Sequence, residues 1–294
     1  MEHITVLKEE AVDALHLSAH STVVDATYGS GGHANAILTR LNERGCYVGI
    51  DADESALTGI DVARHKATVH LVHENFRNIA EILRSLHIEK VDAILADLGW
   101  RMEQFSDGGK GFSFAQSEPL QMTFGDPNDY PFTAADIVNE WSEETLANIF
   151  YGYAEERFSR RIAKAIVEAR AKTVITTSTQ LANIVLAALP KAVGHKRIHG
   201  ATKVFQALRI AVNDELGALE TLLKDGFTAL RPGGHMAIIT FHSIEDRLVK
   251  HYFRELVREG RGDFAPKKPI APTATEAAHN PRARSAKLRI IKKL

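Results

Sequence analysis

The stretch Thr22-Val-Val-Asp25-Ala-Thr-Tyr-Gly29-Ser-Gly31-Gly32-His33 indicates the fold class of the chain. Its apolar start, residues 22–26, stops at a glycine-rich segment, and the apolar residues that follow recur at helical spacing. This order predicts a strand, a tight turn and a helix. Glycines at such a turn let the backbone approach a ligand closely.

The same alternation continues along the chain. Further strands are predicted at 46–50, 68–72, 91–96 and 235–241, with helical spacing between the earlier ones. Strands that alternate with helices predict an α/β fold, in which a parallel sheet is covered on both faces. The carboxyl ends of its strands are then expected to form the ligand-binding edge.

A long interval separates the last two of these strands. Asp97 and His235 are about 138 residues apart, whereas a crossover with one helix takes roughly 30. Apolar residues between 136 and 188 fall at helical spacing, so we predict a helical insertion. The chain is expected to return through one long helix whose apolar face runs from Phe205 to Leu223. We assign residues 1–103 and 205–294 to the sheet domain and 104–204 to the inserted domain.

Composition excludes several classes of protein. The 294 residues are 45% hydrophobic and 25% charged, which is typical of globular domains and excludes a mainly disordered chain. There is no run of roughly 18 apolar residues and no secretion segment at the start, so we expect a cytoplasmic protein. Cys46, the only cysteine, excludes an internal disulfide and a cysteine-based zinc cluster. The paired histidines 16/20 and 70/73 lack further ligands at metal spacing, so no metal is expected.

Charge is segregated along the chain. Residues 258–294 hold 10 Lys and Arg against 3 Asp and Glu, whereas the remainder holds 26 against 34. A basic tail on an acidic body is suited to a polyanion such as nucleic acid. The charge distribution is explained equally well by a tail that is basic for solubility. In that alternative, residues 285–291 form an edge strand.

The glycine turn and Asp51 together indicate an adenosine-bearing cofactor. Asp51 ends the second strand, 20 residues after Gly31, where a carboxylate can accept both ribose hydroxyls. The spacing fits a dinucleotide as well as S-adenosylmethionine. Asp25 favours S-adenosylmethionine, because a carboxylate beside the turn repels a diphosphate and attracts a sulfonium and an ammonium. A nicotinamide oxidoreductase remains the alternative.

Several segments resemble one family, the bacterial ribosomal RNA small subunit methyltransferase H family, also called MraW. With Gly31-Gly32-His33 they cover almost the whole chain: Gly111-Phe-Ser-Phe114, residues 205–216, Thr240-Phe-His-Ser-Ile-Glu-Asp-Arg247 and residues 280–289. The resemblance implies a class I, Rossmann-like methyltransferase domain with an inserted helical substrate-recognition domain. It also implies methyl transfer from S-adenosyl-L-methionine to N4 of a cytidine in small-subunit ribosomal RNA, free or in the assembled subunit.

Site residues follow from matching motifs. The resemblance implies these cofactor contacts: Gly31, Gly32, His33, Asp51, Phe76, Asp97 and Gln104. For catalysis we expect Asp97 to accept a hydrogen bond from the target amine, with His242 and Ser243 as further candidates. For RNA phosphates we expect six basic residues: Lys203, Arg209, Arg247, Arg282, Arg284 and Lys287.

Two segments depart from the family pattern. Trp100-Arg-Met-Glu103 and Gln121-Met-Thr-Phe-Gly125 lack the small hydroxyls and carboxylates that the family carries there. These departures leave two alternatives to the implied activity. One is a methyltransferase of the same fold that acts on another nucleic acid or on protein, and the other is a catalytically weakened assembly factor that binds ribosomal RNA.

Overall fold

The computed structural model describes residues 4–58, 64–98, 109–190 and 200–294. The chain forms two compact units, Met1–Arg101 with Leu216–Leu294, and Met102–Glu215. In the part of the chain that the structure describes, no helix is long and apolar enough to cross a membrane.

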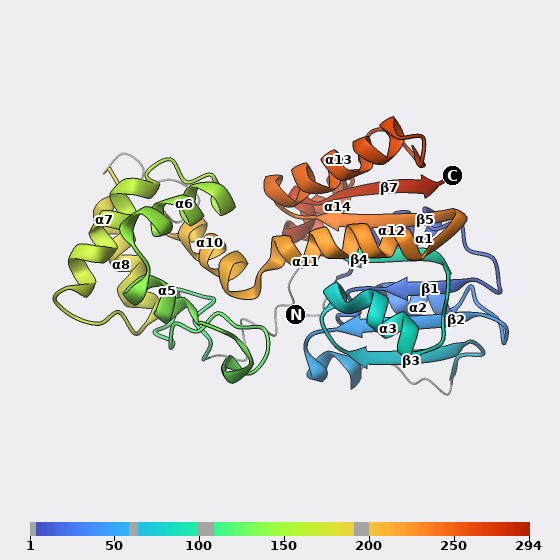
Figure 1. Ribbon diagram of the computed structural model, residues 1–294, viewed down its shortest axis with the longest axis horizontal. Coiled ribbons are helices and arrows are strands. Elements are labelled where there is room, and N and C mark those ends of the chain that lie inside the picture. Colours follow the sequence, from blue (N-terminus) through green and yellow to red (C-terminus); the bar gives the residue numbers. More distant parts are fainter. Residues whose placement is uncertain (1–3, 59–63, 99–108, 191–199) are drawn as a thin grey trace. The chain divides into compact units, whose positions relative to one another are not determined.

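The first unit is built on one seven-stranded sheet with the order β3-β2-β1-β4-β5-β7-β6 (Figure 1). Strands β1 to β5 run parallel, and β7 pairs antiparallel with both β5 and β6. This is the strand arrangement of a class I methyltransferase, as predicted. The strands are β1 (Thr22–Asp25), β2 (Cys46–Asp51), β3 (Thr68–His73), β4 (Val91–Asp97), β5 (Leu230–Thr240), β6 (Gly262–Phe264) and β7 (Lys287–Lys293).

Helices cover both faces of this sheet because successive strand residues point to opposite sides. Val23 packs with α1 (Lys8–Asp13) and α2 (Gly32–Leu38) on one face. Val24 packs on the other face with a second group of helical elements. These are α3 (Ile79–Ser85), α11 (Glu215–Thr221), the π-helical turn η5 (Leu222–Gly226), α12 (Phe227–Ala229) and α13 (Ser243–Arg258). Two short elements, α14 (Ala274–His279) and the 3-10 helix η6 (Pro281–Ser285), precede β7.

The second unit is helical, as the spacing predicted. Its helices are α5 (Ala134–Glu140), α6 (Glu143–Ala154), α7 (Ser159–Arg170), α8 (Ser178–Ala188) and α10 (Thr202–Asn213). They enclose a separate apolar core that also takes Phe112, Leu120 and Met122 from the preceding loop. The divergent segment 121–125 is bound within this unit, where Phe124 donates its backbone N–H to Asn213 Oδ1.

The long return helix was predicted wrongly. It is two helices, because Asp214 adopts a left-handed conformation with φ 44° and ends α10 before α11 begins. Asp is among the residues that tolerate this conformation. Phe205 and Val212 lie in the core of the helical unit, and Leu219 and Leu223 lie in the sheet core. Residues 205–215 therefore group with the insertion, eleven residues beyond the boundary that we assigned.

The carboxyl-terminal strand is not at the edge of the sheet. The solubility alternative placed an edge strand at residues 285–291, but β7 lies between β5 and β6. The edge on this side is β6, a three-residue strand that the sequence analysis missed. A strand this short carries too few residues for a periodic signal.

Candidate functional site

The glycine turn lies where β1 ends. Gly29 and Gly31 have positive φ angles of 57° and 76°, a conformation that glycine adopts without steric cost. A Cβ built on Gly29 would meet only Thr27 O, at 3.8 Å, so the backbone borders open space at that position. Gly31 then serves as the N-cap of α2. This turn provides the close backbone approach that an adenosine-bearing cofactor needs.

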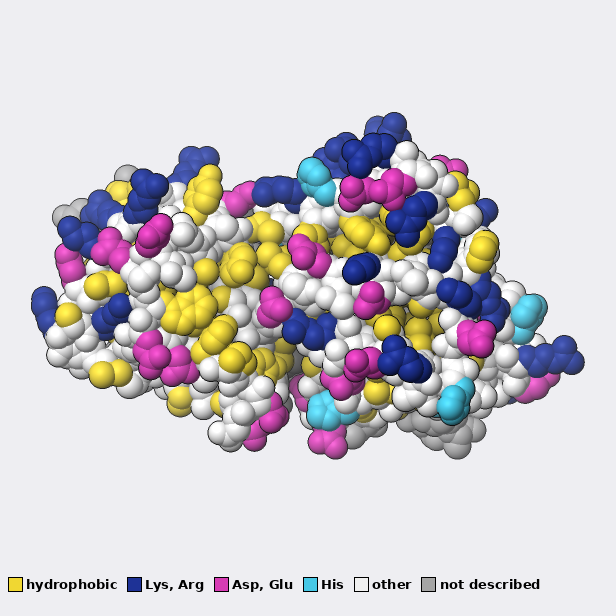
Figure 2. Space-filling view, viewed as in Figure 1, with side chains coloured by type: hydrophobic (Ala, Val, Ile, Leu, Met, Phe, Trp, Pro, Cys, Tyr) yellow, Lys and Arg dark blue, Asp and Glu magenta, His cyan; other side chains and the backbone are white. Residues whose placement is uncertain are grey.

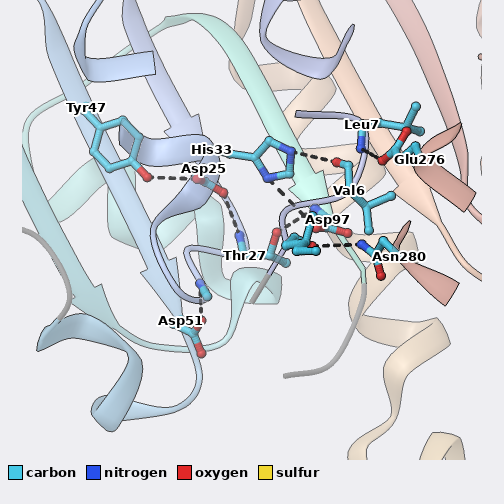
Figure 3. Close-up of polar contacts among 12 residues, drawn as sticks. Val6, Leu7, Asp25, Thr27, His33, Tyr47, Asp51, Asp97, Glu276 and Asn280 are labelled. Atoms are coloured by element: carbon cyan, nitrogen blue, oxygen red, sulfur yellow. Dashed lines mark hydrogen bonds and ion pairs between the residues drawn. The ribbon is translucent and has the colours of Figure 1, made fainter. Parts of the chain in front are cut away.

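Asp51 ends β2 beside this turn (Figure 3). Its Oδ2 accepts a hydrogen bond from Gly29 N–H at 2.8 Å, and its Oδ1 accepts one from Asp53 N–H at 2.9 Å. Each carboxylate oxygen has a second lone pair. The arrangement therefore fits a ribose that donates two hydroxyl hydrogen bonds to Asp51.

Asp25 lies under the turn, inside the protein. Its Oδ2 accepts a hydrogen bond from the Tyr47 phenol at 2.9 Å, and its Oδ1 accepts one from Thr27 N–H at 3.3 Å. Burial raises the pKa of Asp25 to about 7, although the hydrogen bonds from Tyr47 and Thr27 lower it. Because only 1% of the residue is exposed, its charge acts on a bound cation through the local field.

His33 and Asp97 form the other side of the site (Figure 3). His33 Nδ1 lies 4.0 Å from Asp97 Oδ2, and His33 Nε2 lies 3.2 Å from the carbonyl oxygen of Val6. The backbone N–H of Asp97 donates to Thr27 Oγ1 at 2.6 Å. Since β2 and β4 flank β1, the carboxylates of Asp51 and Asp97 lie at one edge, on either side of the turn.

Phe76 and Gln104 are the remaining predicted cofactor contacts. Phe76 begins the 3-10 helix η3 (Phe76–Asn78) after β3 and is half-buried against the core beneath α3. Its ring therefore has a packing role whether or not it also borders an adenine. Gln104, like the divergent segment 100–103, lies outside the described residues.

His242 has a structural role at the start of α13. It is the N-cap of α13, where its Nδ1 accepts a hydrogen bond from Glu245 N–H at 3.3 Å. Its Nε2 lies 3.0 Å from Glu245 Oε1. His242 therefore caps α13 in this structure, and its contact with the target amine stays a prediction. Ser243 is the first, exposed residue of α13.

The predicted RNA contacts divide into two groups. Arg209 is buried and forms a two-bond ion pair with Glu215, at 2.7 and 3.0 Å. Lys287 donates to Asp246 Oδ2 at 2.8 Å, and Arg289 donates to Asp246 Oδ1 at 2.6 Å. Burial raises the pKa of Asp246, but these two partners outweigh it and lower the pKa below the usual value. Arg209 and Lys287 are therefore ion-pair partners in the structure, a role that competes with the phosphate contacts predicted for them.

The other four basic residues are exposed or half-buried, and their phosphate contacts stay predictions. Lys203, Arg247 and Arg284 are exposed, and Arg282 is half-buried. Lys203 donates to the carbonyl of Glu155, and Arg284 donates to the carbonyl of Ala277. Figure 2 shows Lys and Arg side chains mixed with acidic ones over this face of the sheet unit. Because charges of both signs are mixed on that face, an RNA contact there would be made by individual basic residues and not by a continuous basic surface.

Three parts of the site do not follow from the motifs in the sequence. Tyr47 looks like an ordinary core residue of a strand, and its pairing with Asp25 becomes visible only when β1 and β2 are aligned. Thr27 carries the hydroxyl that holds the end of β4. Residues 4–7 have no motif, yet they contact the glycine turn. A threonine two residues after a strand-ending Asp is the only local signal among the three.

Comparison with known proteins agrees with this geometry. The model of the MraW methylase family matches residues 1–294. A protein named ribosomal RNA small subunit methyltransferase H from Symbiobacterium thermophilum is 41% identical, over 99% of this chain and 96% of its own length. One of the same name from Limosilactobacillus fermentum is 42% identical, over 99% of this chain and 98% of its own length. The chain thus belongs to the MraW methylase family and is a methyltransferase that uses S-adenosylmethionine.

Proposed function

We propose that this chain transfers a methyl group from S-adenosylmethionine to the N4 amino group of a cytidine in small-subunit ribosomal RNA. The observation that carries the proposal is the glycine turn flanked by Asp51 and Asp97 at one sheet edge. The names of the two relatives support the RNA class of the substrate. Such a substrate would place the enzyme in the cytoplasm.

The residues of the turn fit the cofactor in its chemistry. The cofactor, when bound, supplies a methyl group on a positively charged sulfur. Asp51 is placed to accept the ribose hydroxyls, and the buried charge of Asp25 favours a cation above the turn. Gly29 leaves the backbone open to the ligand. These features disfavour a dinucleotide, whose diphosphate would lie beside Asp25.

Asp97 is the residue that we assign to the target amine. The N4 lone pair of cytosine is delocalised into the ring, so the amine must be held in line with the methyl group for transfer. A carboxylate at the end of β4 accepts a hydrogen bond from one N–H, and fixed orientation of this kind supplies much of a rate gain. A target base in structured RNA must also be unstacked to reach the site.

The test is mass spectrometry of nucleosides from small-subunit ribosomal RNA. Cells that lack the protein should lose one N4-methylated cytidine, and the parental gene should restore it. Labelling of fractionated RNA, DNA and protein with methyl-labelled cofactor separates the same-fold alternative with another substrate. An RNA profile identical with and without the protein would instead favour the assembly factor, which binds ribosomal RNA without modifying it.

A further inference from the structure

We propose that Glu276 and Asn280, close to the carboxyl terminus, are positioning residues for the cofactor turn and act on it through residues 4–7. The proposal rests on the proposed function, because it concerns the same cofactor site. Neither residue was singled out for this site by its sequence pattern, and neither contacts the turn directly in the described structure.

Both residues hold the amino-terminal segment from α14 and its end (Figure 3). Glu276 Oε1 accepts a hydrogen bond from Leu7 N–H at 2.8 Å. Asn280 Nδ2 donates to the carbonyl oxygen of Ile4 at 3.0 Å. Asn280 is itself buried, and its Oδ1 accepts a hydrogen bond from Arg282 N–H, which fixes the orientation of the amide. The two side chains thus hold both ends of residues 4–7.

The segment that they hold lies directly on the turn. A Cβ built on Gly32 would come within 1.7 Å of Thr5 Oγ1, so the first residue of α2 and Thr5 are in close contact. The carbonyl oxygen of Val6 lies 3.2 Å from His33 Nε2, and His33 Nδ1 faces Asp97. Residues 4–7 therefore contact two expected cofactor residues and reach Asp97 through His33.

The backbone of Leu7 shows that the segment is held against its own preference. Leu7 has φ 49° and ψ 38°, a left-handed conformation that a leucine side chain disfavours. Its side chain is fully buried in the sheet core, and its N–H is the group that Glu276 holds. A residue in such a conformation persists only when its surroundings fix it. Without Glu276, Leu7 is expected to relax and residues 4–7 to shift on the turn.

This arrangement predicts an effect on cofactor affinity separate from any effect on stability. Calorimetry should measure binding of S-adenosylmethionine and S-adenosylhomocysteine to the full chain and four variants, at a temperature where circular dichroism shows each to be folded. Glu276→Ala and Asn280→Asp should bind about tenfold more weakly, as expected for loss of one well-placed hydrogen bond. Glu276→Gln keeps an oxygen for Leu7 N–H and should remain within about threefold of the parent. Asn280→Asp keeps the shape of the side chain and so guards against a folding failure.

The matched control is Glu43→Ala. Glu43 is exposed, in the same unit, and forms no hydrogen bond or ion pair with the described residues. It should bind the cofactor as the parent does. Parental cofactor affinity in Glu276→Ala and Asn280→Asp, together with a lowered free energy of unfolding, would overturn the proposal. Glu276 and Asn280 would then only stabilise the fold, by hydrogen bonds between the two terminal segments. Equal weakening in Glu276→Gln and Glu276→Ala would also overturn it. A parent that binds the cofactor but methylates no RNA would refute the proposed substrate alone.

Discussion

The carboxylate of Asp51 accepts a hydrogen bond from the backbone N–H of Gly29 at 2.8 Å, so the residue that ends β2 fixes the turn that follows β1. The group expected to bind the ribose therefore also shapes the backbone beneath the cofactor. Its second oxygen holds Asp53 N–H, which orients the carboxylate before any ligand arrives. An acceptor that is already oriented loses little conformational freedom on binding.

Replacing Asp51 with Ala should weaken S-adenosylmethionine binding about ten- to a hundredfold. Loss of a charged hydrogen-bonding partner costs about 1.5 to 3 kcal/mol. Calorimetry measures the dissociation constant, and circular dichroism confirms the fold. Asp51→Asn, which keeps one carbonyl oxygen, should fall between the parent and the Ala variant. An unchanged dissociation constant in a folded Ala variant would remove Asp51 from the site.

Asp25 predicts a pH dependence of both stability and binding. Its pKa of about 7 in the folded protein exceeds the ordinary value of 3.8, because burial disfavours the charged form. The folded state thus keeps a proton that the unfolded state releases, and this contribution to stability falls as pH rises from about 4 to about 7. Cofactor affinity should rise through the same range, since an ionised Asp25 attracts a cation.

Asp25→Asn is the variant that checks this account. It should be more stable than the parent at pH 8 by on the order of 1 kcal/mol, or about 2 to 4 °C in melting temperature. Its cofactor affinity should be weaker at pH 8 and nearly flat between pH 6 and 8. A parental affinity that does not change with pH would contradict a titrating carboxylate under the turn.

Asp97→Asn should lower turnover more than it lowers cofactor affinity. The amide retains an oxygen but loses the charge that favours a hydrogen bond from the target amine, a change of roughly tenfold or more in kcat. Steady-state kinetics with small-subunit RNA give kcat, and calorimetry gives the cofactor dissociation constant. Were affinity to fall while kcat stayed parental, Asp97 would be a cofactor ligand only.

Gly32→Ala should displace Thr5 from the turn. The three atoms nearest to the added Cβ all belong to the Thr5 side chain, and the closest is at 1.7 Å. Overpacking of this kind costs about 1 to 3 kcal/mol and should weaken cofactor binding. Thr5→Gly in the same chain removes those atoms and should recover much of the loss. No recovery in the double variant would show that the contact between Thr5 and Gly32 is not the cause.

Arg284 and Lys287, two basic residues near β7, should differ in function. Arg284→Ala should make the salt dependence of RNA binding shallower by about one unit, as for one lost phosphate contact. Lys287→Ala should leave that slope unchanged and lower stability by about 0.5 to 1 kcal/mol, because it removes one of two partners of Asp246. Filter binding over a series of salt concentrations measures this slope for the parent and both variants. Equal slopes for the parent and Arg284→Ala would remove Arg284 from the RNA interface.

The sheet was predictable because each buried strand is a short apolar run that stops at a polar residue or glycine. The predicted end of β2 and of β4 each differ from the structure by one residue. The break at Asp214 was not predictable from periodicity, since the apolar positions keep their phase across it. Helical spacing indicates which face is apolar, and here two successive helices use that face in two different cores.

The candidate site was predictable where the position of a residue follows from the strand that it ends. Asp51 and Asp97 end strands that the sequence already indicated, so their place at the sheet edge followed from topology. The structural partners of Lys287 and His242 were not predictable, because they are not visible in a local pattern. Asp246 is 41 residues from Lys287. His242 lies in a motif shared with its own capping partner, Glu245, and the motif does not tell capping from catalysis.

The most direct test of the proposed activity uses purified protein, S-adenosylmethionine with a trideuterated methyl group, and small-subunit ribosomal RNA from cells that lack the protein. Naked RNA and assembled subunits are assayed in parallel, with the Asp97→Asn variant as the control. Nucleosides are then separated and identified by mass spectrometry. The account predicts one cytidine that carries the trideuterated methyl on N4 in at least one of the two substrates, and much less with the variant. Label on another atom or base, or no label in either substrate from a protein that binds the cofactor, would contradict it.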